Sequence, residues 1–139
     1  MEIGAQLYTV REYAKTLDDL SNTLKKIYDI GYRVVQVSGT CSYEPQWLKD
    51  QLESIGLKCA ITHYNIDRIA NETDQVVNEH KQFYCKYIGI GGTRNGLKNG
   101  MNDYIEFCNE FKPAGKRIAE LGLKLMYHNH HMEFVVHKL

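Results

Sequence analysis

Ile30-Gly31-Tyr32-Arg33-Val34-Val35 is one of three closely similar phrases in this sequence. The other two are Ile55-Gly56-Leu57-Lys58-Cys59-Ala60 and Leu121-Gly122-Leu123-Lys124-Leu125-Met126. Each contains a glycine, a basic residue two positions later and an apolar run. A glycine at this place is typical of the left-handed residue that follows a helix. An unbroken apolar run is typical of a strand buried on both faces of a parallel sheet. Each phrase therefore predicts a junction from a helix to a parallel strand.

The same pattern extends to both sides of these junctions. A fourth unit, Tyr84-Cys85-Lys86-Tyr87-Ile88-Gly89-Ile90, has the apolar run but no glycine at the helix end, and the segment from Ile3 to Val10 reads as a first strand. Apolar residues at helical spacing predict helices over 17–30, 45–55 and, more weakly, 76–84. A last helix is predicted from Asn102 to Leu121, with a kink or break at Pro113. The order is therefore β-α-β-α-β-α-β-α-β.

Such alternation predicts an α/β protein with a parallel sheet. Two architectures remain open, part of a closed (β/α)8 barrel and an open flavodoxin-like sheet in which strand one lies between strands two and three. The strand starts lie about 30 residues apart, as in a barrel. Only residues 135–139 follow the last motif, and they are too few for a fifth helix of ordinary length. We therefore expect residues 1–139 to form the N-terminal half of a barrel, without an internal domain boundary.

Net charge and composition bear on which partners and which cellular compartment the sequence predicts. Lys and Arg together number 17, as do Asp and Glu, so the formal net charge is zero. This balance gives no electrostatic reason to expect nucleic acid or an anionic membrane as a partner. No run of about 18 apolar residues is present, and the first residues lack a signal-peptide pattern. The four cysteines form no C-x-x-C pair. Their even number would permit disulfides. Their scattered, core-like placement instead predicts reduced thiols and a cytoplasmic protein.

The candidate chemistry lies where the predicted strands end, because function gathers at the carboxyl ends of parallel strands. Strand five ends in Tyr127-His128-Asn129-His130-His131-Met132-Glu133-Phe134. Alternate side chains of a strand share a face, so His128 and His130 are expected to point together. Two imidazoles with Glu133 nearby suit a divalent metal or an acid/base pair. The alternative is a polar strand end with solvated histidines.

Two further strand ends give weaker indications of a functional site. His63 ends strand three, and a lone histidine there is more often a hydrogen-bonded structural residue than a catalytic one. Gly89-Ile90-Gly91-Gly92 lacks the spacing of a phosphate-binding loop, so we interpret it as a strand end with a tight turn. His80 and His137 are given no role.

Two motifs at opposite ends of the chain resemble a known family. Gly4-Ala5-Gln6-Leu7-Tyr8-Thr9-Val10-Arg11 resembles the G-x-Q-L-Y-S/T-x-R of the first strand of sugar phosphate isomerases/epimerases. The run from Gly122 to Phe134 is similar to their G-x-x-x-x-Y-H-N-H-x-x-E-F at strand five. The resemblance covers the whole chain and the first half of the family's barrel.

The resemblance implies a xylose isomerase-like TIM barrel in carbohydrate metabolism, acting on a sugar or sugar phosphate. Such isomerases and epimerases use a divalent metal (Mn, Mg or Co) and move a proton next to a sugar carbonyl through an enediolate. His128 falls where many members have their metal-binding Glu. The resemblance further implies Glu133 and His63 as catalytic residues, and it implies substrate-binding roles for Gln6, Tyr8, Asn129 and His130.

The same resemblance sets an expectation for this chain alone. The family's other metal ligands come from strands six to eight, so a metal held by His128 alone would be weakly bound. We therefore expect the 139-residue chain to be inactive by itself. Five strands leave open edges and an apolar inner face, which predicts a homo-oligomer. A non-catalytic, self-associating half-barrel is the alternative function, and a flavodoxin-like binding domain is a third.

Overall fold

The sheet is parallel, and its strands follow the order of the chain. The computed structural model describes residues 3–94 and 100–134. In this part of the chain five strands pair in the order β1-β2-β3-β4-β5. Their bounds are β1 Gly4–Gln6, β2 Val34–Val37, β3 Lys58–His63, β4 Tyr87–Ile90 and β5 Lys124–Tyr127. A flavodoxin-like sheet would place β1 between β2 and β3, so this order excludes that fold and agrees with consecutive units of a barrel.

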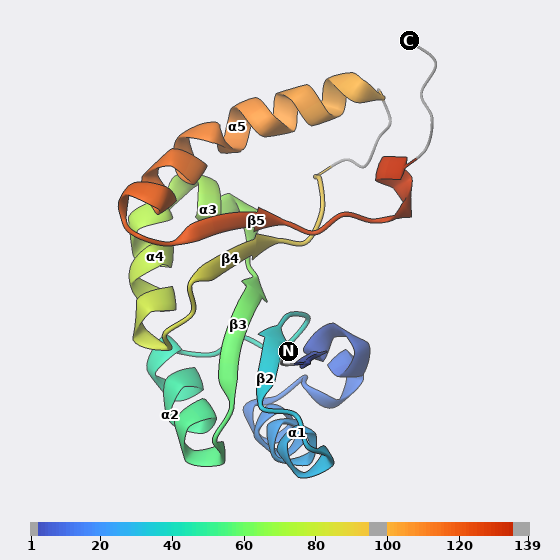
Figure 1. The fold of residues 1–139 in the computed structure, drawn as a ribbon, viewed down its shortest axis with the longest axis vertical. Helices are drawn as coiled ribbons and strands as arrows, with labels where there is room; N and C mark the ends of the chain where they lie inside the picture. Colours follow the sequence, from blue (N-terminus) through green and yellow to red (C-terminus); the bar gives the residue numbers. More distant parts are fainter. Residues whose placement is uncertain (1–2, 95–99, 135–139) are drawn as a thin grey trace.

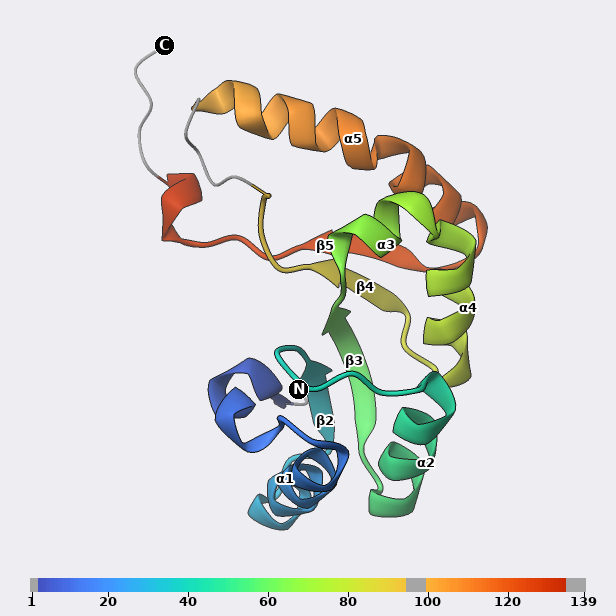
Figure 2. The same ribbon diagram turned by 180° about the vertical axis from the view of Figure 1, so that it is seen from behind.

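Helices cover one side of this curved sheet (Figures 1 and 2). Their bounds are α1 Leu17–Ile30, α2 Pro45–Ile55, α3 Ile66–Asn71, α4 Thr73–Gln82 and α5 Met101–Glu120, with 3-10 turns η1 Leu7–Tyr13 and η2 His131–Phe134. The other side of the sheet, which would face the axis of a closed barrel, is open. No helix among the described residues is long and apolar enough to cross a membrane.

The structure corrects the end of the first strand and adds one helix that was not predicted. The first strand ends at Gln6 rather than at Val10, because the chain turns there into η1 and buries Leu7 completely. The weakly predicted third helix is α4, and the short α3 before it was not predicted. Asn65 caps α3 by accepting hydrogen bonds from the backbone N–H groups of Asp67 and Arg68. A kink or a break was expected at Pro113, and α5 continues through this residue with an axis that bends in Figure 1. Pro113 is exposed, so water can reach the backbone carbonyl that loses its partner.

The predicted helix ends are confirmed. Gly31, Gly56 and Gly122 follow α1, α2 and α5 with φ angles of 118°, 88° and 86°. This left-handed conformation costs a residue with a Cβ more than it costs glycine. Tyr84 holds the corresponding position after α4 with φ 56°, and it is the one non-glycine residue with positive φ in the described chain.

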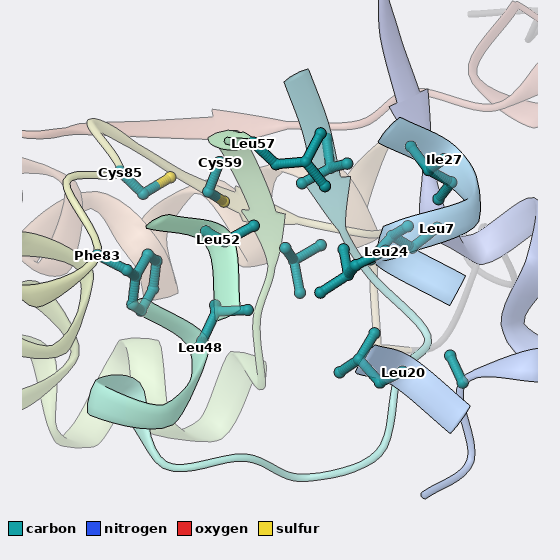
Figure 3. Close-up of a cluster of buried hydrophobic side chains, with 13 residues drawn as sticks. Leu7, Leu20, Leu24, Ile27, Leu48, Leu52, Leu57, Cys59, Phe83 and Cys85 are labelled. Carbon is teal, nitrogen blue, oxygen red and sulfur yellow. The ribbon is translucent and has the colours of Figure 1, made fainter. Parts of the chain in front are cut away.

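The core lies between the sheet and its helices, in two clusters. Figure 3 shows the first, in which Leu20, Leu24 and Ile27 of α1 and Leu48 and Leu52 of α2 pack against β2 and β3. The second lies under α3, α4 and α5 and includes Ile69, Val76, Ile88, Phe111 and Ile118. All four cysteines are free thiols, but Cys108 is exposed rather than core-like.

Strand register assigns side chains to the two faces. Val35, Val37, Thr62 and Ile88 are buried towards the helices. The alternate positions therefore line the open inner face. Gln6 is paired with Gln36, and His63 with Gly89, which in turn is paired with Met126. A register shift between Val35 and Gln36 keeps Gln36 on this inner face beside β3. Polar residues thus gather on the inner face at the carboxyl rim.

Candidate active site

Three imidazoles meet at the carboxyl rim of the sheet. The rings of His63 and His128 lie edge to face with centroids 4.9 Å apart, and those of His128 and His130 also lie 4.9 Å apart. We call His63, His128 and His130 the histidine cluster. Gln36, at the end of β2, adds a fourth side chain, because its Nε2 lies 2.6 Å from Nε2 of His63. Residues from β2, β3 and the segment after β5 therefore form one polar site.

The neighbours of His63 in the chain, Thr62 and Tyr64, set the direction of its side chain. Thr62 points to the helices, where its Oγ1 lies 2.8 Å from Nε2 of the buried His80. The Tyr64 hydroxyl donates to Glu79 at 2.5 Å, also on α4. Arg68 holds Glu79 through both of its terminal nitrogens. Because successive side chains of a strand point to opposite faces, these contacts leave His63 facing the inner side.

Glycines of β4 and the following turn make room for the cluster. A Cβ on Gly91 would lie 3.1 Å from Nδ1 of His63, and one on Gly92 would lie 3.5 Å from Cε1 of His130. A Cβ on Gly89 would collide with the Thr62 carbonyl oxygen and would lie 3.1 Å from Cδ2 of His63. None of these three glycines has positive φ. Gly89 and Gly91 are therefore needed here for space rather than for conformation, whereas a Cβ on Gly92 would make an ordinary contact with His130.

Burial keeps His63 neutral. It lowers the pKa of this imidazole, and positive charge on His128 and His130 would lower it further. When the Gln36 amide nitrogen donates to Nε2, the ring proton is on Nδ1. A neutral imidazole with a lowered pKa can accept a proton at neutral pH.

Glu133 is tied to the cluster through His130. It accepts hydrogen bonds from the Tyr127 hydroxyl at 2.6 Å and from the backbone N–H of His130 at 2.6 Å. Burial acts to raise the pKa of Glu133, but these hydrogen bonds outweigh it, and the net direction is downward. The carboxylate lies 3.9 Å from Nδ1 of His130. Glu133 is therefore an ionised partner for His130, held in place by η2 and Tyr127.

The cluster does not amount to a metal centre by itself. No group of three or more His, Cys, Asp or Glu side chains within 3–94 and 100–134 is placed to hold an ion together. Tight sites need three or four protein ligands. The residues described here therefore do not fit a complete metal site, and the assignment of His128 as a ligand stays a prediction.

The remaining predicted residues lie apart from the cluster. Gln6 ends β1 on the inner face, next to Gln36 in the register. Tyr8 lies in η1, half-exposed, with the Arg11 guanidinium 4.4 Å from its ring centre and with Gly39 against its edge. Asn129 is exposed between the two histidines.

Two features of the site were missed from the sequence. Gln36 lies within an apolar strand, and only its pairing beside β3 brings it to His63. The glycines from 89 to 92 were interpreted as a strand end with a tight turn, and it was not foreseen that Gly89 and Gly91 make room for the His63 ring. Their recurrence at alternate positions on one face of the strand was the signal for this role.

Known structures share this fold. A sugar phosphate isomerase/epimerase from Parabacteroides distasonis matches with a TM-score of 0.73 and 22% identity, over 96% of this chain and 56% of that one. An L-ribulose 3-epimerase matches with a TM-score of 0.66 and 14% identity over 90% and 48%. A xylose isomerase domain protein from Salmonella typhimurium matches with a TM-score of 0.61 and 7% identity over 89% and 47%. No family model and no curated protein matches the sequence.

The fraction of each known structure that the chain matches is as informative as the similarity of fold. The chain spans about half the length of the solved structures it matches. Its sheet is open, and its strands follow the order of consecutive barrel units. At these identities the likeness concerns the fold. The chain thus has the fold of an incomplete TIM barrel, similar to the first half of sugar phosphate isomerases/epimerases and xylose isomerase-like proteins.

Proposed function

We propose that the histidine cluster belongs to a sugar isomerase or epimerase that moves a proton next to a sugar carbonyl. The observation that carries this proposal is the contact of Gln36, His63 and His128 on one rim, with Glu133 behind His130. The substrate would be a sugar or sugar phosphate. We further propose that the 139-residue chain does not turn over by itself, since the open side of the sheet leaves the site exposed to water.

The proposed roles follow from protonation and hydrogen bonding. In this proposal the entering sugar displaces the Gln36 amide from Nε2 of His63, which frees the basic nitrogen of the neutral ring. Nε2 of His63 then takes the proton from the carbon beside the carbonyl, and the electron pair of that C–H bond moves so that the carbonyl oxygen becomes an enediolate oxygen. N–H groups of Gln36 and His128 face the same space and can stabilise the developing charge. For isomerisation the proton returns from His63 to the neighbouring carbon, and the hydroxyl proton of that carbon moves to the enediolate oxygen. For epimerisation a second acid on the other side of the sugar gives a proton to the opposite face, and His63 keeps the proton that it removed. Glu133 orients His130 by accepting the hydrogen bond of its backbone N–H.

The first test is sugar binding by the chain as it is. NMR spectra of the histidine rings would be recorded during titration with D-fructose and with D-fructose 6-phosphate. We expect the rings of the cluster to shift while exposed His131 does not, and His63→Gln to weaken binding by about fivefold or more, because a hydrogen-bonding ring is lost. His131→Gln is the matched control. Shifts that are absent, or that are the same in His63→Gln, would contradict the proposal.

A second measurement tests the chemistry. The chain would be joined to the carboxyl half of the Parabacteroides distasonis protein, which supplies the missing part of the barrel. Incorporation of deuterium from D2O next to the ketose carbonyl is expected in this completed barrel, and His63→Gln should slow it by about 100-fold or more. Exchange that persists in His63→Gln would remove His63 from the reaction.

Self-association without catalysis is the second candidate function. The observation that favours it is the exposure of apolar side chains on the inner face, where Tyr87 is 38% and Met126 is 42% exposed. The strands β1 and β5 are also unpaired on their outer sides in the described chain. A second copy could cover both features.

A further inference from the structure

A large apolar cavity lies at the opposite end of the sheet from the histidine cluster. It is formed where β2, β3 and β4 begin and where α2 ends, and its volume is about 730 Å³. Its apolar wall includes Leu52, Leu57, Cys59 and Phe83, which Figure 3 shows in the first core cluster. This volume lies in the range of about 300–1,000 Å³ that is typical of small-molecule sites.

Positive charge surrounds this apolar wall. Lys49, Lys58 and Lys86 all line the cavity, and Glu53 is the one carboxylate in its described lining. Lys15 is the only lysine in an ion pair within the described chain, so these three ammonium groups are not neutralised by carboxylates. An apolar interior with a cationic rim complements a molecule that has an apolar body and an anionic head.

The backbone conformation of Tyr84 is a second, independent indication that this cavity is a binding site. The helix-to-strand junctions after α1, α2 and α5 have glycine at the left-handed position, and the junction after α4 has Tyr84 with φ 56°. A side chain in this conformation is strained. The tyrosine ring lines the cavity, is 69% exposed and has the Lys49 ammonium 5.5 Å from its centre. The strained residue thus contributes little to the core and stands at the mouth of the cavity, as strained residues at binding sites often do.

We propose that this cavity binds a small carboxylate-bearing apolar molecule, such as a medium-chain fatty acid. Its hydrocarbon chain lies against Leu52, Leu57 and Phe83, and its carboxylate meets Lys58 and Lys86. Tyr84 closes the mouth over the chain with its ring. This site is separate from the histidine cluster, because it lies at the amino-terminal ends of the strands.

Titration calorimetry of the 139-residue chain tests the proposal with decanoate and with decylammonium, which have the same chain length and opposite charge. Decanoate is expected to bind about tenfold more tightly or better, because the rim is cationic. Lys86→Gln should weaken decanoate binding by about threefold, whereas Lys25→Gln on the exposed side of α1 should not. Equal affinities for the two probes, or no binding of decanoate, would overturn the proposal.

The variant Tyr84→Gly distinguishes a loss of decanoate binding from a loss of folding. Glycine removes the strain of the left-handed position, so this variant should raise Tm by about 4 °C while it weakens decanoate binding by about fivefold or more. A variant that fails to fold cannot produce this pair of results. Decanoate affinity that is unchanged in Tyr84→Gly would overturn the proposal. So would dimerisation that is independent of decanoate and lost in Tyr84→Gly, because the cavity would then belong to a second copy of the chain.

Discussion

At the scale of single residues, His80 shows how a buried imidazole can stabilise the site without belonging to it. Its Nδ1 lies 2.7 Å from the carbonyl oxygen of Val76, and its Nε2 lies 2.8 Å from Thr62 Oγ1. Burial is the main cause that lowers its pKa from 6.5 to about 4. The ring is therefore neutral in the folded protein, and it ties β3 to α4 behind His63.

The lowered pKa of His80 predicts a pH dependence of stability. Below pH 6.5 the unfolded chain takes up a proton that folded His80 refuses until about pH 4, so its contribution is complete above pH 6.5 and is lost as the pH falls between these values. The loss should reach roughly 3 kcal/mol at pH 4. Urea unfolding at several pH values should give a flatter profile for His80→Gln than for His131→Gln. Parallel profiles for the two variants would show that folding does not lower the pKa of His80.

At the scale of elements, the contact between β3 and β4 depends on a missing side chain. A Cβ on Gly89 would collide with the carbonyl oxygen of Thr62 in the neighbouring strand. A Cβ on Gly115, inside α5, would meet Leu125 Cδ2 at 3.6 Å, which is an ordinary contact. A side chain is therefore excluded at Gly89, whereas one can be accommodated at Gly115.

Alanine substitution at the two positions should therefore have opposite effects. Gly89→Ala should destabilise the protein by about 2 kcal/mol or more, because the strands must move apart. Gly115→Ala should stabilise it by about 0.5–1 kcal/mol, because alanine favours a helix interior. Chemical denaturation of both variants checks this, and a Gly89→Ala variant as stable as the parent would mean that β3 and β4 are not so closely apposed.

At the scale of the whole molecule, the open inner face of the sheet sets the described chain apart from a closed barrel. The buried side chains lie on the helix side, while inner-face residues such as Met126 stay exposed to solvent. Burial of apolar surface contributes about 25 cal/mol per Å², so covering this face would be favourable. In a closed barrel the remaining strands would cover it.

The exposed inner face predicts self-association of the 139-residue chain. Sedimentation velocity at micromolar concentration should give a mass above the 16.1 kDa of one chain. Met126→Glu, on the inner face, should weaken association by about tenfold, because a charge would have to be buried. Met101→Glu is the control, since Met101 is 51% exposed on α5. A clean monomer at every concentration would contradict this prediction.

Much of the architecture is encoded in short stretches of sequence. The spacing of Leu20, Leu24 and Ile27 predicts α1, and Gly31 marks its end, because periodicity and capping act within a few residues. The rim position of His63 and His128 follows in the same way from where their strands end. The resemblance at residues 4–11 and 122–134 then made a barrel the expected architecture, and the strand order agrees with it.

The chemistry within the site depends instead on how the strands pair. Gln36 meets His63 because a register shift aligns β2 with β3, and Gly91 lies beside the same ring because β4 is the next strand. Tyr84 adopts a left-handed conformation that its residue type disfavours. Such contacts join residues far apart in the chain, so no local pattern carries them. They arise only when the packed sheet brings those residues together.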